Sequence, residues 1–345
     1  MKYAYKGREI RPMVEIYHDV VPYLGGITEG EFYRDAEKCA AAWKKANAAI
    51  SDCFGELLPP RAPSAAPLSY GHLVSIGAQV NLPEDSEPNI RPFVNSLEEG
   101  IALLKDCRGI DFFDNPTAKH YIEVNEYLQS QFPEYQIAPL AGYGVEGIIT
   151  TAELMRGQDF FMDLYDDPEL THEFLTLLNE NLIAFNRAQR VRNGLSEMNP
   201  AGGAIADDFA SLIPTDLWPE FVIPYWNQYY AGIGEGNYHW LHCENTHPAQ
   251  LRYLKDAGIT HYQPSVADQL TLENVRANTD VAFDWLLYAY RIVDMTDEQI
   301  QAWVDQTAEA GVSRIRTQFG KYAWSAGKMD RILAFYKAFE KYRVE

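Results

Sequence analysis

The chain has 345 residues, 47% of them hydrophobic, and is long enough to bury a large core as one big α/β domain or two smaller ones. Its 49 acidic and 29 basic residues give a net charge of −20, which argues against nucleic acid or an anionic membrane surface as a partner. It has no run of about 18 apolar residues and no apolar segment near its start, so we expect neither a membrane span nor a signal peptide.

The cysteines are scattered along the chain without CxxC spacing. Such a pattern indicates neither a disulfide framework nor a thiolate zinc cluster. We therefore expect a protein of the reducing cytoplasm. The four positions are Cys39, Cys53, Cys107 and Cys243.

The first part of the chain is predicted to be helical. Apolar residues recur at helical spacing over residues 29–49, and the pattern extends toward 58 before Pro59 and Pro60 end it. A Pro/Ala/Ser segment over 59–67 is the only stretch that resembles a linker. We therefore expect a helical N-terminal extension over residues 1–64 and one further domain over residues 65–345.

Strand patterns alternate with helical patterns through the rest of the chain. The predicted strands are 73–82, 136–140, 201–206, 238–243, 258–262, 281–287 and 313–318. The predicted helices are 96–107, 117–131, 148–155, 167–193, 214–230, 296–310 and 328–342. Repeated strand–helix units imply a parallel sheet, and this many of them favour a closed (β/α)8 TIM barrel. No GxGxxG follows the first predicted strand, which weakens a dinucleotide-binding interpretation.

Polar side chains cluster where the predicted strands end. In a barrel the functional groups collect at the carboxyl ends of the strands, so these residues should share one rim. The candidates for catalysis are Tyr143, Glu146, Asp207, Asp208, His242 and Glu244. The region of Thr317 and Gln318 belongs to the same rim.

His242 and Glu244 are the most informative of these candidates. Side chains alternate along a strand, so these two point the same way while Leu241 and Cys243 point the other way. A His-x-Glu pair at the end of a strand can hold a metal ion through nitrogen and oxygen. A buried strand whose histidines are satisfied by hydrogen bonds explains the pair equally well.

Four stretches together resemble the uroporphyrinogen decarboxylase superfamily. They are PLAGYGVEGIITTAELMRGQDFFMDLYDDPEL at 139–170, ADDFASLIPTDLWPEFVIPYWNQ at 206–228, LHCENTHPAQLRYLKDAGI at 241–259 and DEQIQAWVDQTAEAGVSRI at 297–315. The resemblance extends from about residue 65 to the end. It implies a (β/α)8 barrel with a helical N-terminal extension.

Within this superfamily the chain is most similar to the ether-cleaving methyltransferases of anaerobic O-demethylase systems. That resemblance implies transfer of a methyl group from an aromatic methyl ether to the cob(I)alamin of a separate corrinoid protein, because the chain has no DxHxxG corrinoid signature. It also implies zinc, which that branch assigns to two glutamates and a histidine that Glu84, Glu99 and His120 match. His242 and Glu244 are the other metal hypothesis.

Two other functions stay open from the sequence. A tetrapyrrole decarboxylase of the uroporphyrinogen type would need no metal, but Arg8, Arg11 and Arg34 lack the arginine-rich motif of those enzymes. A barrel that binds a ligand or a partner without catalysis is the third. The branch with thiol acceptors carries His-x-Cys where His242-x-Glu244 stands, so activation of a thiol is not expected.

Overall fold

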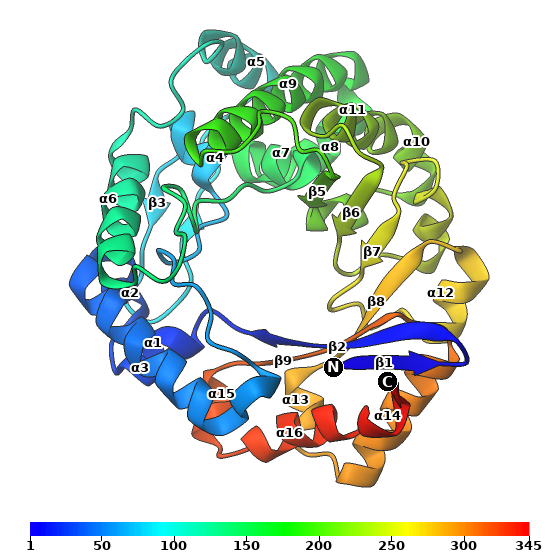
Figure 1. Ribbon diagram of the computed structural model, residues 1–345. Helices are drawn as coiled ribbons and strands as arrows, with labels where there is room; N and C mark the ends of the chain where they lie inside the picture. The colour runs from blue at the N-terminus through cyan, green and yellow to red at the C-terminus, as the bar shows by residue number, and fades with distance from the viewer. Residues whose placement is uncertain (345) are drawn as a thin grey trace.

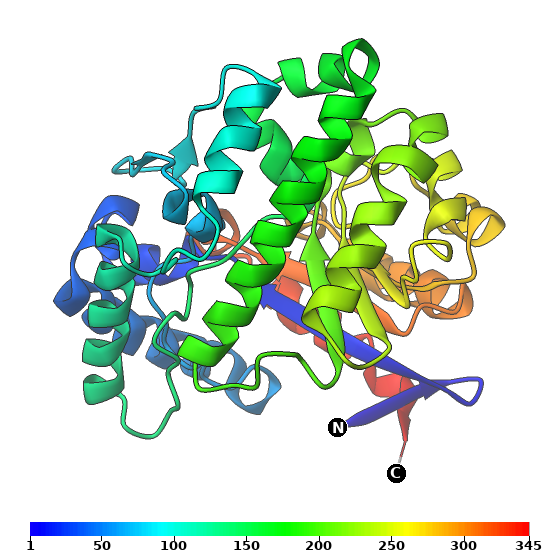
Figure 2. The same ribbon diagram turned by 90° about the horizontal axis from the view of Figure 1, so that it is seen from above.

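A mostly parallel sheet forms the centre of the protein, a computed structural model in which residues 1–344 are described. Its strands run in the order β10-β1-β2-β9-β8-β7-β6-β5, and every pairing from β2 through β9 to β5 is parallel. The bounds are β1 (Lys2–Tyr5), β2 (Arg8–Ile16), β5 (Gly202–Ala206), β6 (Tyr238–His242), β7 (His261–Gln263), β8 (Ala282–Leu287), β9 (Arg314–Phe319) and β10 (Arg343–Val344). β1 pairs antiparallel with β10, so the two termini lie side by side (Figure 2).

Two irregular extended segments, 64–68 and 140–147, continue the barrel wall beyond β5. Leu68 pairs in parallel with Tyr143, through hydrogen bonds from Leu68 N to Gly142 O and from Gly144 N to Leu68 O, both 2.7 Å. A further bond of 2.5 Å from Gly147 N to Ala206 O joins the second segment to β5. Together with the parallel strands, the two segments confirm the predicted (β/α)8 TIM barrel.

Side chains from the surrounding helices complete the backbone hydrogen bonding of segment 64–68. Trp43 Nε1 donates to Ser64 O at 2.9 Å, and Tyr121 Oη donates to Ala66 O at 2.7 Å. Buried backbone groups need partners of this kind where no strand ladder supplies them. The segment is therefore fixed in place without being a regular strand.

Helices surround the sheet on its outer side (Figure 1). Those of the first half are α1 (Val20–Gly25), α2 (Glu29–Arg34), α3 (Ala36–Phe54), α4 (Gly71–Ser75), α5 (Leu97–Asp106), α6 (Pro116–Gln131), α7 (Ile148–Arg156), α8 (Asp159–Asp166) and α9 (Pro168–Arg192). Those of the second half are α10 (Trp218–Phe221), α11 (Ile223–Ile233), α12 (Leu272–Asn278), α13 (Ala289–Ile292), α14 (Asp297–Glu309), α15 (Lys321–Ser325) and α16 (Met329–Lys337). A separate hairpin joins β3 (Val80–Asn81) to β4 (Asn89–Ile90).

Two predictions about the first hundred residues need correction. Residues 1–64 are not a purely helical extension, because β2 pairs with β9 and a boundary at residue 64 would cut the sheet. The buried apolar residues of β2, Ile10 and Ile16, are separated by an even number of positions, as expected for one face of a strand. The predicted strand 73–82 contains instead the end of α4, a turn and the two residues of β3.

We predict that Asn125 holds the seam of the barrel together. This fully buried side chain accepts from Ala65 N at 2.8 Å and donates to Pro139 O and Ala141 O at 3.0 and 2.9 Å. Asn125→Ala should lower the free energy of unfolding by about 2–4 kcal/mol, because buried backbone groups lose their partners. Urea unfolding measures this loss.

Asn47 provides the control for this experiment. It makes the same kind of double hydrogen bond to the backbone of Arg61, but at a solvent-exposed position. Water can replace a lost partner there, so Asn47→Ala should cost less than about 1 kcal/mol. Equal losses in the two variants would contradict the role assigned to Asn125.

Candidate active site

A cavity of about 650 Å³ opens at the carboxyl ends of β2, β6, β7 and β9. Ile16, His242, Gln263 and Gln318, at or next to these strand ends, line it. The other walls come from the loops after β2, before α4, between β3 and β4 and after β7, and from helices α1, α2 and α3. The opening therefore lies at the rim where barrel enzymes carry their chemistry.

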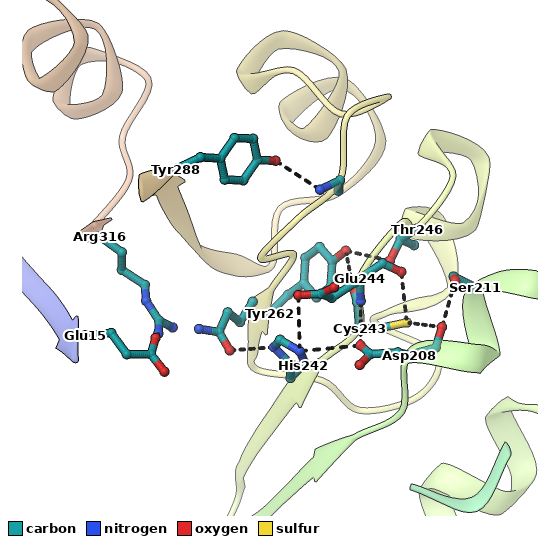
Figure 3. A network of polar contacts seen from close by, with 12 residues as sticks. Glu15, Asp208, Ser211, His242, Cys243, Glu244, Thr246, Tyr262, Tyr288 and Arg316 are labelled. Atoms are coloured by element: carbon teal, nitrogen blue, oxygen red, sulfur yellow. Dashed lines mark hydrogen bonds and ion pairs between the residues drawn. The ribbon is translucent and has the colours of Figure 1, made fainter. Parts of the chain in front are cut away.

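Histidine and carboxylate side chains meet at the floor of this cavity (Figure 3). His242 Nε2 lies 3.4 Å from Asp208 Oδ1 and 3.8 Å from Glu244 Oε1. Asp208 Oδ1 also accepts from Glu244 N at 2.8 Å, which fixes the Asp208 carboxylate beside the ring. His242 and Glu244 both line the cavity, whereas Leu241 and Cys243 are fully buried on the other face of the strand. Burial raises the pKa of the Cys243 thiol well above its usual range, so this thiol is not a nucleophile.

A chain of polar contacts continues from His242 across the barrel. The side-chain amide of Gln263 lies 2.8 Å from His242 Nδ1 and, on its other side, contacts the guanidinium of Arg316. Arg316 donates to Asp284 Oδ2 at 2.9 Å and to a carboxylate oxygen of Glu15. The side chains of β2, β6, β7, β8 and β9 are thus connected from strand to strand.

Four of the six predicted site residues, Tyr143, Glu146, Asp207 and Asp208, do not line the cavity. Tyr143 is buried outside the barrel wall, with its ring centre 5.1 Å from that of Tyr121 and its Oη 3.4 Å from Ser75 Oγ. The carboxylate of Asp207 is also buried, and it accepts from Thr150 N and Trp226 Nε1, both at 2.7 Å. Asp207 therefore stabilises the start of α7 and holds α11, which is a structural task.

Glu146 lies behind the cavity wall. Burial is the largest influence on its carboxyl and raises its pKa to about 8, although a hydrogen bond with Ser69 acts in the opposite direction. Ser69 itself lines the cavity, so Glu146 is one side chain removed from it. A carboxyl group with this pKa holds its proton at neutral pH.

Aromatic rings form much of the cavity wall. Among the aromatic residues of the second half of the chain, Trp240 lines the cavity, whereas Tyr225 bonds to His172, Trp226 bonds to Asp207 and Tyr290 is exposed to solvent. The rings that join Trp240 come mainly from the first seventy residues: Tyr17, Phe32, Tyr33, Trp43 and Tyr70. The N-terminal part of the chain is therefore half of the site.

The side chains predicted to hold zinc are not gathered into a set of three ligands. Among residues 1–344, no group of three His, Cys, Asp or Glu side chains is placed to hold a metal ion. In the alternative set, Glu84 accepts from Arg34 and Thr28, Glu99 accepts from Asn95 N at 2.8 Å, and His120 Nε2 lies 2.8 Å from Tyr33 O. Each of these side chains is occupied in a different local interaction.

The sequence pattern did not identify several residues of the site as functional candidates. Gln263 and Arg316 lie on strands whose patterns predict only burial, and Glu15 and Tyr17 fall in a region predicted to be helical. Gln263 is the last residue of β7, and His242 is the last residue of β6. Functional groups of a barrel collect at the carboxyl ends of its strands, so Gln263 would have been a candidate if the end of β7 had been known.

The fold is a barrel with a cavity at the carboxyl ends of its strands. A family model for uroporphyrinogen decarboxylase (URO-D) matches residues 70–280, and the chain belongs to this family. A methyltransferase from Methanosarcina mazei shares the fold with a TM-score of 0.66 at 15% sequence identity, over 96% of this chain and 93% of that one. No curated protein sequence matches the chain. Within residues 1–344, no helix is both long and apolar enough to cross a membrane.

We predict that Glu146 makes stability depend on pH. The ordinary pKa of its carboxyl is 4.5 and the folded value is about 8, so between these values the folded state binds more protons than the unfolded state. The free energy of unfolding should therefore fall by a few kcal/mol as pH rises from about 4.5 to 8, and then level off. Glu146→Gln should remove this slope.

Urea unfolding at a series of pH values tests this expectation. Glu134→Gln, which removes an exposed carboxylate, is the matched control and should retain the slope of the wild type. The same slope in wild type and Glu146→Gln would show that this carboxyl ionises normally.

Proposed function

We propose that this protein transfers a methyl group from an aromatic methyl ether to the cob(I)alamin of a separate corrinoid protein. Membership of the URO-D family and the shared fold with a methyltransferase are consistent with this function. The observation that carries it is the composition of the cavity. Aromatic rings form its walls, an imidazole lies at its floor, and positive charge is nearly absent from it.

The aromatic walls suit a planar ring. Rings of Tyr, Trp and Phe offer large flat apolar surfaces against which an arene can stack or pack edge-on. The volume of about 650 Å³ falls in the usual range for sites that bind small molecules. A methoxyarene held there would bring its ether oxygen within reach of the polar floor.

The charges of the cavity argue against a tetrapyrrole decarboxylase. Its lining includes the carboxylates of Glu15, Glu87 and Glu244, and Arg61 is the one Arg or Lys among the lining residues. The Arg61 guanidinium donates to Ile16 O at 3.2 Å. A substrate with several carboxylates would meet like charges here and lose affinity.

The chemistry of demethylation requires stabilisation of the oxygen that loses its methyl group. The cob(I)alamin of the partner protein would supply the nucleophile that accepts the methyl. His242 would stabilise the developing aryl oxide through a hydrogen bond. The aromatic walls would hold the ring so that its methyl group points toward the mouth of the cavity.

We predict that His242→Ala lowers methyl transfer by about 10²-fold or more, the usual effect of removing one stabiliser of a developing oxyanion. The fold should be retained, because His242 is a partly exposed rim residue. Glu244→Gln should also lower the rate, by removing charge next to the imidazole. The assay is anaerobic, with methoxyarenes and a reduced corrinoid protein, and it measures the phenol formed.

His239→Ala is the control for this prediction, because His239 lies on the same strand but contacts Gly258 O at 3.0 Å and stacks on Tyr230, away from the cavity. Its rate should stay within a few-fold of the wild type. Wild-type rates in both the His242 and Glu244 variants would exclude this floor as the catalytic centre. Decarboxylation of uroporphyrinogen, without demethylation of any methoxyarene, would overturn the proposed function.

A further inference from the structure

The orientation of the Arg316 side chain is fixed by anionic partners. Its guanidinium bridges Asp284, at 2.9 Å, and Glu15. Asp284 is almost fully buried and also bonds to His261 Nε2 at 2.5 Å, so it cannot turn away. A guanidinium has only donors, and Arg316 therefore presents N–H groups to whatever lies next to it.

Gln263 is the neighbour that receives these N–H groups. A side-chain amide can face Arg316 with its oxygen or with its NH₂ group. Only the oxygen can accept from the guanidinium, and this choice turns the NH₂ group toward His242 Nδ1, 2.8 Å away. The opposite orientation would place donor against donor at Arg316.

This amide orientation determines where the imidazole carries its proton. Because Nδ1 of His242 accepts a hydrogen bond from Gln263, the neutral ring has its proton on Nε2. Nε2 lies 3.4 and 3.8 Å from the carboxylate oxygens of Asp208 and Glu244, longer than a good N–H···O bond. The Nε2–H group thus remains available to a ligand oxygen.

We infer that Gln263 and Arg316 are positioning residues that hold His242 as an Nε2–H hydrogen-bond donor, and that His242 is therefore not a zinc ligand. A metal on Nε2 would need the lone pair of that nitrogen, with the ring proton on Nδ1 donated to an acceptor. Here Nδ1 faces a donor instead. The part of this inference that concerns the substrate oxygen rests on the proposed function, whereas the tautomer does not.

Nuclear magnetic resonance of the full-length protein, with ¹⁵N-labelled histidine, tests the tautomer directly. Spectra recorded at roughly pH 8, where an ordinary imidazole is neutral, distinguish Nε2–H from Nδ1–H, and His242→Ala assigns the signal. We expect Nε2–H in the wild type. We expect Nδ1–H in Gln263→Glu, because a carboxylate accepts from both Arg316 and the ring. A wild-type ring with its proton on Nδ1 would overturn the inference.

Zinc titration gives a second readout that does not depend on activity. Gln263→Glu should bind zinc at least about tenfold more tightly than the wild type, because a carboxylate on Nδ1–H is the usual support of a metal-bound histidine. The gain should disappear when His242→Ala is added. Gln318→Glu adds the same charge to the same cavity from β9 and is the matched control, which should not show the gain. Wild-type zinc that is lost in His242→Ala would refute the inference.

Kinetics separate this inference from the proposed function. If methoxyarenes are substrates, Gln263→Glu should lower kcat by about 10–100-fold and leave KM nearly unchanged, because the aromatic walls that bind the ring are intact. If no methoxyarene reacts but the tautomer and the zinc response are as expected, the proposed function fails and the positioning role stands. Equal tautomers in wild type and Gln263→Glu would remove the positioning role itself.

Discussion

Buried backbone N–H and C=O groups need hydrogen-bond partners, and this requirement constrains the barrel more than any other. A ring of strands satisfies itself by hydrogen bonding, but segments 64–68 and 140–147 are too irregular to do so throughout. Side chains of Trp43, Tyr121 and Asn125 supply the missing partners from the helices outside. The helices that follow β2 are therefore part of the barrel wall and not an accessory to it.

The need for backbone hydrogen-bond partners also explains why Asp207 and Asp208 have different roles. Both follow β5, and successive residues at the end of a strand point to opposite sides. Asp207 turns outward and serves the N–H groups at the start of α7, whereas Asp208 turns inward and lies beside His242. The sequence pattern locates such a pair but does not say which member points inward, because that depends on the register with the neighbouring strands.

The parts of the structure that were predictable are those with a regular period. Alternation along β6 places His242 and Glu244 on one face, and helical spacing predicts α9 almost to its ends. β2 was missed because charged residues and Pro12 interrupt its apolar positions, so that its sequence resembles a polar loop although it is nine residues long. Most rings of the aromatic wall were missed for a different reason: they come from α2, α3 and the loops after β2 and before α4, and helical spacing does not say which helix faces reach the mouth of a barrel.

The contacts of His242 also show why the residue types present near a histidine are not enough to predict a metal site. Histidine and two carboxylates within 4 Å are a plausible ligand set by composition. The partner of the other ring nitrogen decides between a ligand and a hydrogen-bond donor, and that partner lies on a different strand. An Nε2–H donor and a Lewis acid can both stabilise the oxygen of a departing aryl oxide. In this barrel, the fixed guanidinium of Arg316, acting through Gln263, favours the donor.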